Sequence, residues 1–155
     1  MKSVDIYLQD EAATLALGAS LGQRCGGYGL IFLEGDLGAG KTTLTRGLLG
    51  GLGHRGAVKS PTFTLVEPYS IEGSNIWHFD LYRLADPDEL EFLGIRDYFS
   101  ADELCIIEWP CKGAGVLPEP DLRITMSVAG DGRQACLKPL TERAAEWCRD
   151  LAGAP

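Results

Sequence analysis

The sequence predicts one α/β domain of three layers, with helices on both faces of a mixed, partly antiparallel central sheet. Three observations indicate this fold. An apolar segment, residues 28–34, leads through a glycine-rich loop into an amphipathic helix, residues 43–52. Two pairs of strand-like segments are separated by short turns, and another apolar segment ends in an acid at Glu108. The length of 155 residues suits one domain over residues 1–155.

The N-terminal part of the chain predicts a strand followed by a helix. Residues 4–8 are typical of a short edge strand. Asp10 is placed to cap a helix that runs to about Cys25, with Leu17 and Leu21 facing the core. Residues 28–34, which come next, have the length of a buried strand and lead into the glycine-rich loop.

That loop, residues 35–42, matches the phosphate-binding P-loop pattern G-x-x-x-x-G-K-[ST] at every fixed position. Its glycines allow backbone conformations in which successive N–H groups point inward, toward a phosphate tail. Lys41 supplies a compact cation for the β- and γ-phosphates, and the Thr42 hydroxyl is the usual Mg²⁺ ligand. Because a strand precedes the loop and a helix follows it, the sequence predicts a P-loop NTPase-like domain.

The middle of the chain predicts a hairpin and a helix. Residues 58–69 and 76–82 have the composition of two strands, and the short turn between them favours antiparallel pairing. Residues 86–94 begin with helix-capping residues and end with a glycine, which predicts a helix that turns Leu90 and Leu93 inward.

The last third predicts a buried strand, a hairpin and a helix. Residues 104–108 form the buried strand, and a loop rich in proline and glycine follows it. Residues 122–128 and 134–139 predict a second hairpin. Thr141 caps a final helix. The inward residues of that helix are Ala144, Trp147, Cys148 and Leu151.

Composition restricts the classes of partner and site. The net charge is −8, and the 14 lysines and arginines are scattered, which argues against a surface that grips nucleic acid by itself. The five cysteines include no C-x-x-C pair, so we expect free thiols in a reducing cytosol and neither a zinc site nor a disulfide framework. We also expect a cytoplasmic protein with no membrane segment, because no signal sequence or long apolar run occurs.

Two carboxylates are candidates for chemistry beside the phosphates. A P-loop hydrolase needs Mg²⁺ held opposite the loop and a group that places the attacking water. Glu108, at the end of an apolar strand, fits this description best, and Asp80 is the other candidate. Alternatives stay open: Glu108 as a strand-end carboxylate in solvent, and Asp80 on an exposed sheet face or paired with Arg83.

A segment after the P-loop helix, residues 59–64, lies at the distance of a nucleotide-sensing switch. Pro61 fixes a turn that would aim the hydroxyls of Ser60 and Thr62 at the γ-phosphate or Mg²⁺, although an ordinary turn before a strand is equally consistent. Trp109 directly follows Glu108, where it would either transmit the nucleotide state or be buried as a core aromatic.

The residues favour ATP over GTP and hydrolysis over transfer to a small molecule. Guanine specificity usually depends on an N-K-x-D segment, and the only asparagine, Asn75, does not begin one. Small-molecule kinases clamp the phosphoryl group with an arginine-bearing lid, and the arginines here form no such cluster. A slow, partner-controlled ATPase is therefore favoured. A small-molecule kinase remains the alternative, as does a nucleotide-dependent binding switch whose hydrolysis is incidental.

Five motifs follow one another in order between residues 35 and 110. They are GDLGAGKTT at residues 35–43, VKSPTFTLVEPY at 58–69, HFDLYRL at 78–84, ELEFLGIRDYF at 89–99 and IEWP at 107–110. Together they resemble the bacterial TsaE (YjeE) family, the ATPase component of the tRNA threonylcarbamoyladenosine system. The resemblance implies ATP hydrolysis in support of threonylcarbamoyl transfer to the adenosine just 3′ of the anticodon. A TsaD–TsaB heterodimer would perform the transfer, and this protein would reset it and meet tRNA only indirectly.

The resemblance also implies roles for individual residues. Thr42 and Glu108 would hold Mg²⁺, Asp80 would orient or deprotonate the attacking water, and Lys41 would act with them on the phosphates. The switch and partner residues would be Ser60, Thr62 and Trp109. The ATP-binding residues would be Asp36, Leu37, Gly38, Ala39, Gly40, Lys41, Thr42, Thr43 and Arg133.

Overall fold

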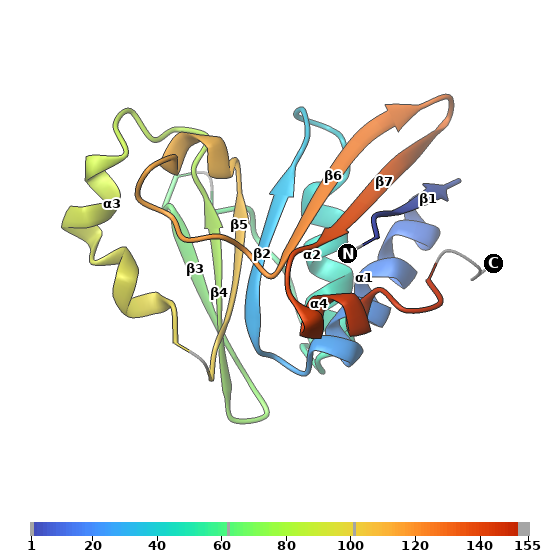
Figure 1. Cartoon of the computed structure of the whole chain (residues 1–155), viewed down its shortest axis with the longest axis horizontal. Coiled ribbons are helices and arrows are strands. Elements are labelled where there is room, and N and C mark those ends of the chain that lie inside the picture. Colours follow the sequence, from blue (N-terminus) through green and yellow to red (C-terminus); the bar gives the residue numbers. More distant parts are fainter. Residues whose placement is uncertain (1, 62, 101, 152–155) are drawn as a thin grey trace.

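The computed structural model describes residues 2–61, 63–100 and 102–151, and one seven-stranded sheet forms its centre (Figure 1). The strands are β1 (Val4–Leu8), β2 (Gly29–Glu34), β3 (Val66–Ile71), β4 (Ser74–Asp80), β5 (Leu104–Glu108), β6 (Leu122–Ala129) and β7 (Gly132–Pro139). Their order across the sheet is β1-β7-β6-β2-β5-β4-β3. Strands β4, β5, β2 and β6 are mutually parallel, whereas the pairs β3–β4, β6–β7 and β1–β7 are antiparallel. The predicted mixed, partly antiparallel sheet is therefore confirmed.

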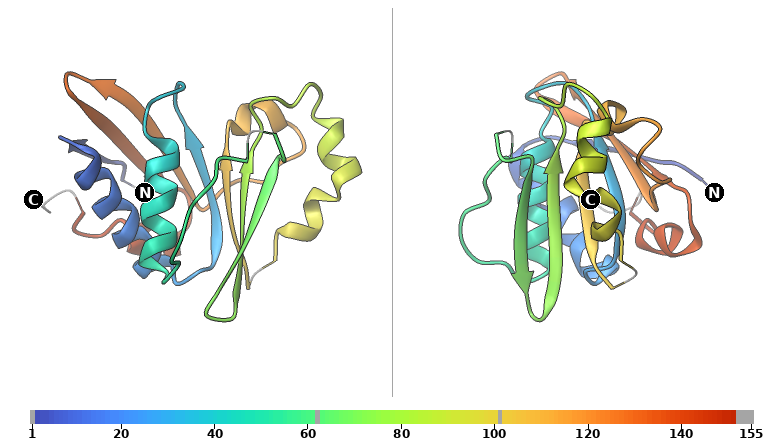
Figure 2. Two further views of the ribbon diagram at one scale, coloured as in Figure 1. Left: turned by 180° about the vertical axis from the view of Figure 1, so that it is seen from behind. Right: turned by 90° about the vertical axis from the view of Figure 1, so that its left-hand side faces the viewer.

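Helices lie on both faces of this sheet and complete the three predicted layers (Figure 2). The helices and 3₁₀ turns are α1 (Glu11–Cys25), α2 (Lys41–Gly51), α3 (Asp88–Leu93), η1 (Ile95–Tyr98), η2 (Pro110–Gly113) and α4 (Glu142–Trp147). Helices α1 and α2 lie side by side on one face, and α4 packs against α1. Helix α3 and its following turn η1 lie on the other face. Within the described part of the chain, no helix is both long and apolar enough to cross a membrane.

The central strand β2 supplies both cores of the protein. Successive side chains of a strand point to opposite faces of its sheet. Ile31 and Leu33 accordingly join the core under α1 and α2, whereas Leu30 and Phe32 join the core under α3. Because β2 is covered on both faces, its end is held firmly where the glycine-rich loop begins.

Glycines bring α1 and α2 into close contact. A Cβ on Gly22 of α1 would lie 2.2 Å from the carbonyl oxygen of Leu48, and a Cβ on Gly47 of α2 would lie 2.4 Å from that of Leu15. No side chain fits at such distances, so only glycine allows the two backbones to approach this closely. This contact fixes the position of α2, and with it the loop at its N-terminus.

The predicted caps of the long first helix and of the last helix are confirmed. The Asp10 carboxylate accepts a 2.8 Å hydrogen bond from the backbone N–H of Ala13, and the Thr141 hydroxyl accepts one of 3.3 Å from Ala144. Each side chain satisfies a backbone donor that the first turn of a helix leaves unpaired.

Two predictions about packing were wrong. The first hairpin strand, predicted over residues 58–69, begins only at Val66, because Leu65 has a positive φ of 73° and its N–H bonds back to the carbonyl oxygen of Pro61. Leu93 does not face the core, since 38% of it is exposed. The short helix α3 ends at Gly94, and the chain turns there so that Ile95 enters the core instead.

Candidate functional site

The glycine-rich loop connects β2 to α2 through backbone conformations that favour glycine. Gly35, Gly38 and Gly40 have φ values of 142°, 82° and 100°. At Gly35 a Cβ would also lie 2.3 Å from the carbonyl oxygen of Met126 on β6. The intervening turn is closed by a 3.1 Å hydrogen bond from the Ala39 N–H to the Asp36 carbonyl oxygen, and Leu37 is exposed at its tip.

The loop leads into the N-terminus of α2, and no side chain caps this end of the helix. The N-cap residue is Gly40, no side-chain cap bond is made, and the first turn carries no acidic residue. The unpaired N–H groups and the positive end of the helix dipole therefore remain available to an anion. Thr42 and Thr43 lie in this first turn and are partly exposed. The arrangement suits a phosphate group.

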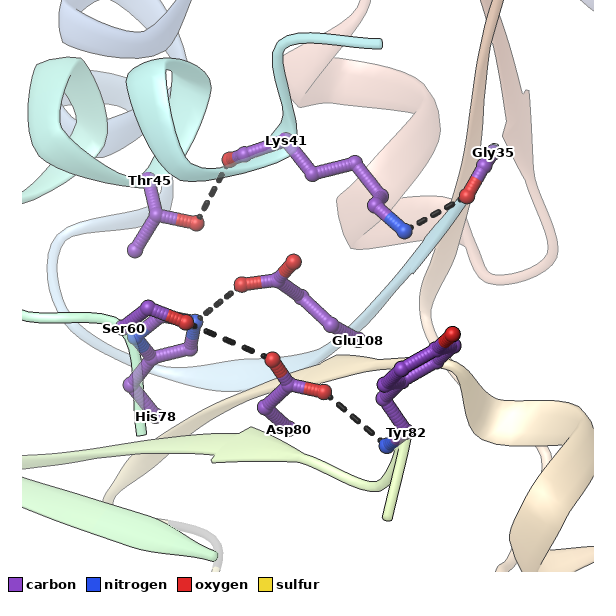
Figure 3. Close-up of polar contacts among 8 residues, drawn as sticks. All are labelled: Gly35, Lys41, Thr45, Ser60, His78, Asp80, Tyr82 and Glu108. Carbon is purple, nitrogen blue, oxygen red and sulfur yellow. Dashed lines mark hydrogen bonds and ion pairs between the residues drawn. The ribbon is translucent and has the colours of Figure 1, made fainter. Parts of the chain in front are cut away.

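Lys41 is buried beneath the loop, and Figure 3 shows its ammonium group directed at the Gly35 carbonyl oxygen. Its Nζ donates a 2.5 Å hydrogen bond to the carbonyl oxygen of Gly35 and lies 3.9 Å from the centroid of the Trp109 ring. Burial lowers the pKa of Lys41, while the nearby carboxylates of Glu108 and Asp80 act in the opposite direction. The ammonium group thus lies between the loop and the two candidate carboxylates.

Those carboxylates lie opposite one another at the ends of neighbouring parallel strands. Asp80 of β4 pairs in register with Glu108 of β5, which in turn lies beside Leu33 of β2, two residues before the loop. Their exposures are only 5% and 3%. The solvent-exposed alternatives for both residues are therefore wrong. Arg83 stacks over the Phe63 ring, 4.3 Å from its centroid.

The residue Ser60 of the predicted switch segment reaches this pair. Its hydroxyl donates a 3.4 Å hydrogen bond to Oδ2 of Asp80, and the Tyr82 N–H donates one of 3.0 Å to Oδ1 (Figure 3). The other predicted switch residue, Thr62, lies outside the described residues. Trp109 is half-buried, with the Tyr82 ring 5.0 Å away, so it is neither a core aromatic nor fully in solvent.

The structure adds to the site a residue that the sequence patterns did not indicate, His78. Its Nε2 lies 2.6 Å from Oε2 of Glu108, and both side chains are buried. The signal in the sequence was its position two residues before Asp80, which puts both on one face of β4.

The donor set fits Mg²⁺. This ion prefers oxygen ligands, takes one or two carboxylates and completes its shell with water and substrate phosphates. Two buried carboxylates and the Thr42 hydroxyl at the adjacent helix start offer such donors. Among the described residues, no group of three or more His, Cys, Asp or Glu side chains could hold a metal ion by itself, so water and substrate phosphates would complete the shell.

Arg133 on β7 reaches the loop from the other side. Its Nη2 donates a 3.1 Å hydrogen bond to the carbonyl oxygen of Gly38. Arg133 also lines a cavity of about 210 Å³, together with Thr43, Gly40 and Asp10. The predicted ATP-binding residues from the loop, the helix start and β7 are thus brought together around one surface.

Comparisons with known proteins show the family to which the chain belongs. The family model described as "Threonylcarbamoyl adenosine biosynthesis protein TsaE" matches residues 8–135. The chain belongs to the TsaE family. A TsaE relative from Haemophilus influenzae is 53% identical over 138 residues, covering 86% of this chain and 87% of the relative. One from Bacillus subtilis is 39% identical over 124 residues, covering 79% and 77%. Both are named tRNA threonylcarbamoyladenosine biosynthesis protein TsaE.

A solved structure extends the TsaE comparison to the fold. The crystal structure of YdiB from Bacillus subtilis superimposes with a TM-score of 0.78 and 30% sequence identity, covering 98% of this chain and 95% of that one. The predicted P-loop NTPase-like α/β fold is confirmed by this likeness.

Proposed function

We propose that this TsaE-family chain is a Mg²⁺-dependent ATPase that acts in the cytoplasm in the threonylcarbamoylation of the tRNA adenosine 3′ of the anticodon. One observation carries the proposal: an uncapped P-loop helix start begins with Lys41, and the ends of β4 and β5 hold two buried carboxylates near the Lys41 side chain (Figure 3). The names of the relatives support the tRNA pathway. When bound, Mg²⁺ would neutralise charge on the β- and γ-phosphates.

Each side chain has a role in this proposal. Thr42 and Glu108 hold Mg²⁺, and Lys41 leaves the Gly35 carbonyl oxygen to bind the phosphates. Asp80 orients or deprotonates the attacking water, because its carboxylate is buried opposite Glu108. The base of ATP occupies the cavity beside Thr43 and Arg133, and the loop residues from Asp36 to Gly40 wrap the phosphates.

The partner in the proposal is a TsaD–TsaB heterodimer. The heterodimer holds the tRNA, and this chain resets the heterodimer. The net charge of −8 supports such indirect contact, because direct binding to tRNA needs clustered cations. Ser60, Thr62 and Trp109 are the proposed switch and contact residues.

The test is ATP hydrolysis with and without the two partners and tRNA. We expect slow release of free phosphate by the chain alone and faster release with TsaD–TsaB. Lys41→Ala abolishes it, whereas Lys138→Ala, which removes an exposed lysine on β7, leaves it unchanged. Parental activity in Lys41→Ala would refute the site, and transfer of phosphate to a small acceptor would identify a kinase instead.

A further inference from the structure

The buried imidazole of His78 has no role in the proposed chemistry, yet it makes one short contact there. Its Nε2 lies 2.6 Å from Oε2 of Glu108, with 0% of the His78 side chain exposed. Its other ring nitrogen, Nδ1, is buried and has no hydrogen-bond partner among the described residues. The contact with Glu108 is therefore the polar contact that orients this ring.

The sheet register explains how the ring reaches the carboxylate. Asp80 lies directly opposite Glu108, and His78 lies opposite Ile106, one step deeper on the same face of β4. The imidazole thus contacts the Glu108 carboxylate from the side of the strand interior, and Asp80 lies beside Glu108 on the neighbouring strand. A hydrogen bond between His78 and Glu108 restrains rotation of the Glu108 side chain beside Asp80.

We propose that His78 is a positioning residue that holds Oε2 of Glu108, so that the second oxygen, turned away from His78 in Figure 3, is presented to Mg²⁺. The inference rests on the proposed function, in which Glu108 is a ligand of that ion. A carboxylate with a free side-chain torsion binds a metal less tightly than one held by a hydrogen bond, and such outer partners are worth about 10- to 100-fold in metal affinity.

The first test compares His78→Phe, which fills the space but removes the donor, with His78→Gln, which keeps an N–H. Mn²⁺ binding to the complex with a non-hydrolysable ATP analogue is followed by electron paramagnetic resonance. We expect His78→Phe to weaken Mn²⁺ binding by about 10- to 100-fold, with metal-free binding of the analogue unchanged, and His78→Gln to restore most of the affinity. Parental Mn²⁺ affinity in folded His78→Phe overturns the positioning role.

The second test needs neither nucleotide nor metal. The chain has two histidines, so the imidazole region of the nitrogen-15 spectrum of the parental protein contains signals only from His78 and, as an internal reference, from His54. We expect a proton on Nε2 of His78 that exchanges slowly and shifts in Glu108→Gln, while His54 stays unchanged. A proton on Nδ1 alone overturns the inference even if His78→Phe fails to fold. If the parental protein does not bind the analogue with Mn²⁺, the proposed function fails, and the role of His78 fails with it.

Discussion

Nζ of Lys41 lies 3.9 Å from the centroid of the Trp109 ring and donates a hydrogen bond to the Gly35 carbonyl oxygen. Trp109 follows β5 with a positive φ of 57°, and the Tyr82 ring packs against it. The P-loop cation and an indole are thus in direct contact. A ligand that draws the ammonium group toward a phosphate changes the electrostatic field at that indole.

This contact predicts a fluorescence signal for nucleotide binding. Adding MgATP should change the emission of Trp109, because Lys41 moves relative to its ring. The change should persist in Trp77→Phe and Trp147→Phe and disappear in Trp109→Phe and Lys41→Ala. A change that survives in Trp109→Phe would place the responding indole elsewhere.

Arg133 should contribute to nucleotide affinity. Its guanidinium lies at the loop beside the cavity, where it can contact an anionic ligand. A hydrogen bond to a charged group is worth about 1.5–3 kcal/mol, so we expect Arg133→Ala to weaken ATP binding by roughly 10- to 100-fold. Calorimetric titration measures this, with the exposed Arg149→Ala as the control. Equal affinities for the two variants would remove Arg133 from the site.

The close contact between α1 and α2 should make one glycine of α2 irreplaceable and another dispensable. Gly47→Ala forces a Cβ against the Leu15 backbone and should destabilise the protein by about 1–3 kcal/mol. Gly50→Ala meets no atom within 4 Å and should stabilise it by up to about 1 kcal/mol, since alanine favours the helix. Denaturant unfolding gives both free energies, and similar values for the two variants would contradict this packing.

Asp121 should make stability depend on acid pH. Burial by itself raises the pKa of its carboxyl, but hydrogen bonds from Arg143, Thr141 and the Leu30 N–H outweigh burial and hold the pKa below its ordinary value. A lowered pKa stabilises the folded state above the unfolded value, about 4, and this contribution disappears as pH falls through the folded pKa.

We therefore expect Asp121→Asn to lower the free energy of unfolding by about 1–3 kcal/mol at pH 7. The difference from the parental protein should shrink below about pH 4, because Asp121 of the parental protein then becomes protonated. Urea unfolding at several pH values measures this, and Asp102→Asn serves as an exposed control. A difference that is constant with pH would show that the charge of Asp121 is not responsible.

The cysteines should differ widely in reactivity. Cys111 is exposed, whereas burial raises the pKa of Cys105 to about 12 and that of Cys148 to about 11. Because the thiolate is the reactive form, a maleimide should label Cys111 first and the two buried cysteines only in denaturant. Peptide mass spectrometry gives the order, and early labelling of Cys105 would contradict its burial.

Local patterns in the sequence predicted much of the fold and part of the site. The glycine pattern before Lys41, the cap at Asp10 and the apolar run that ends at Glu108 each depend on neighbours within a few residues, so the sequence contains their cause. The first part of the strand predicted over residues 58–69 was wrong for the opposite reason. That segment has apolar and β-branched residues, but the positive φ at Leu65 prevents it from extending the hairpin.

Sequence by itself determined the P-loop, the order of strands and helices along the chain, and the carboxylates at strand ends, because phosphate-binding loops and strand periodicity are local properties. Only the tertiary structure decided that Asp80 and Glu108 are opposite and buried, that His78 contacts Glu108, and that Arg133 reaches Gly38. These relationships join residues up to 95 positions apart, and they depend on sheet register and strand order, which are set by packing over the whole core.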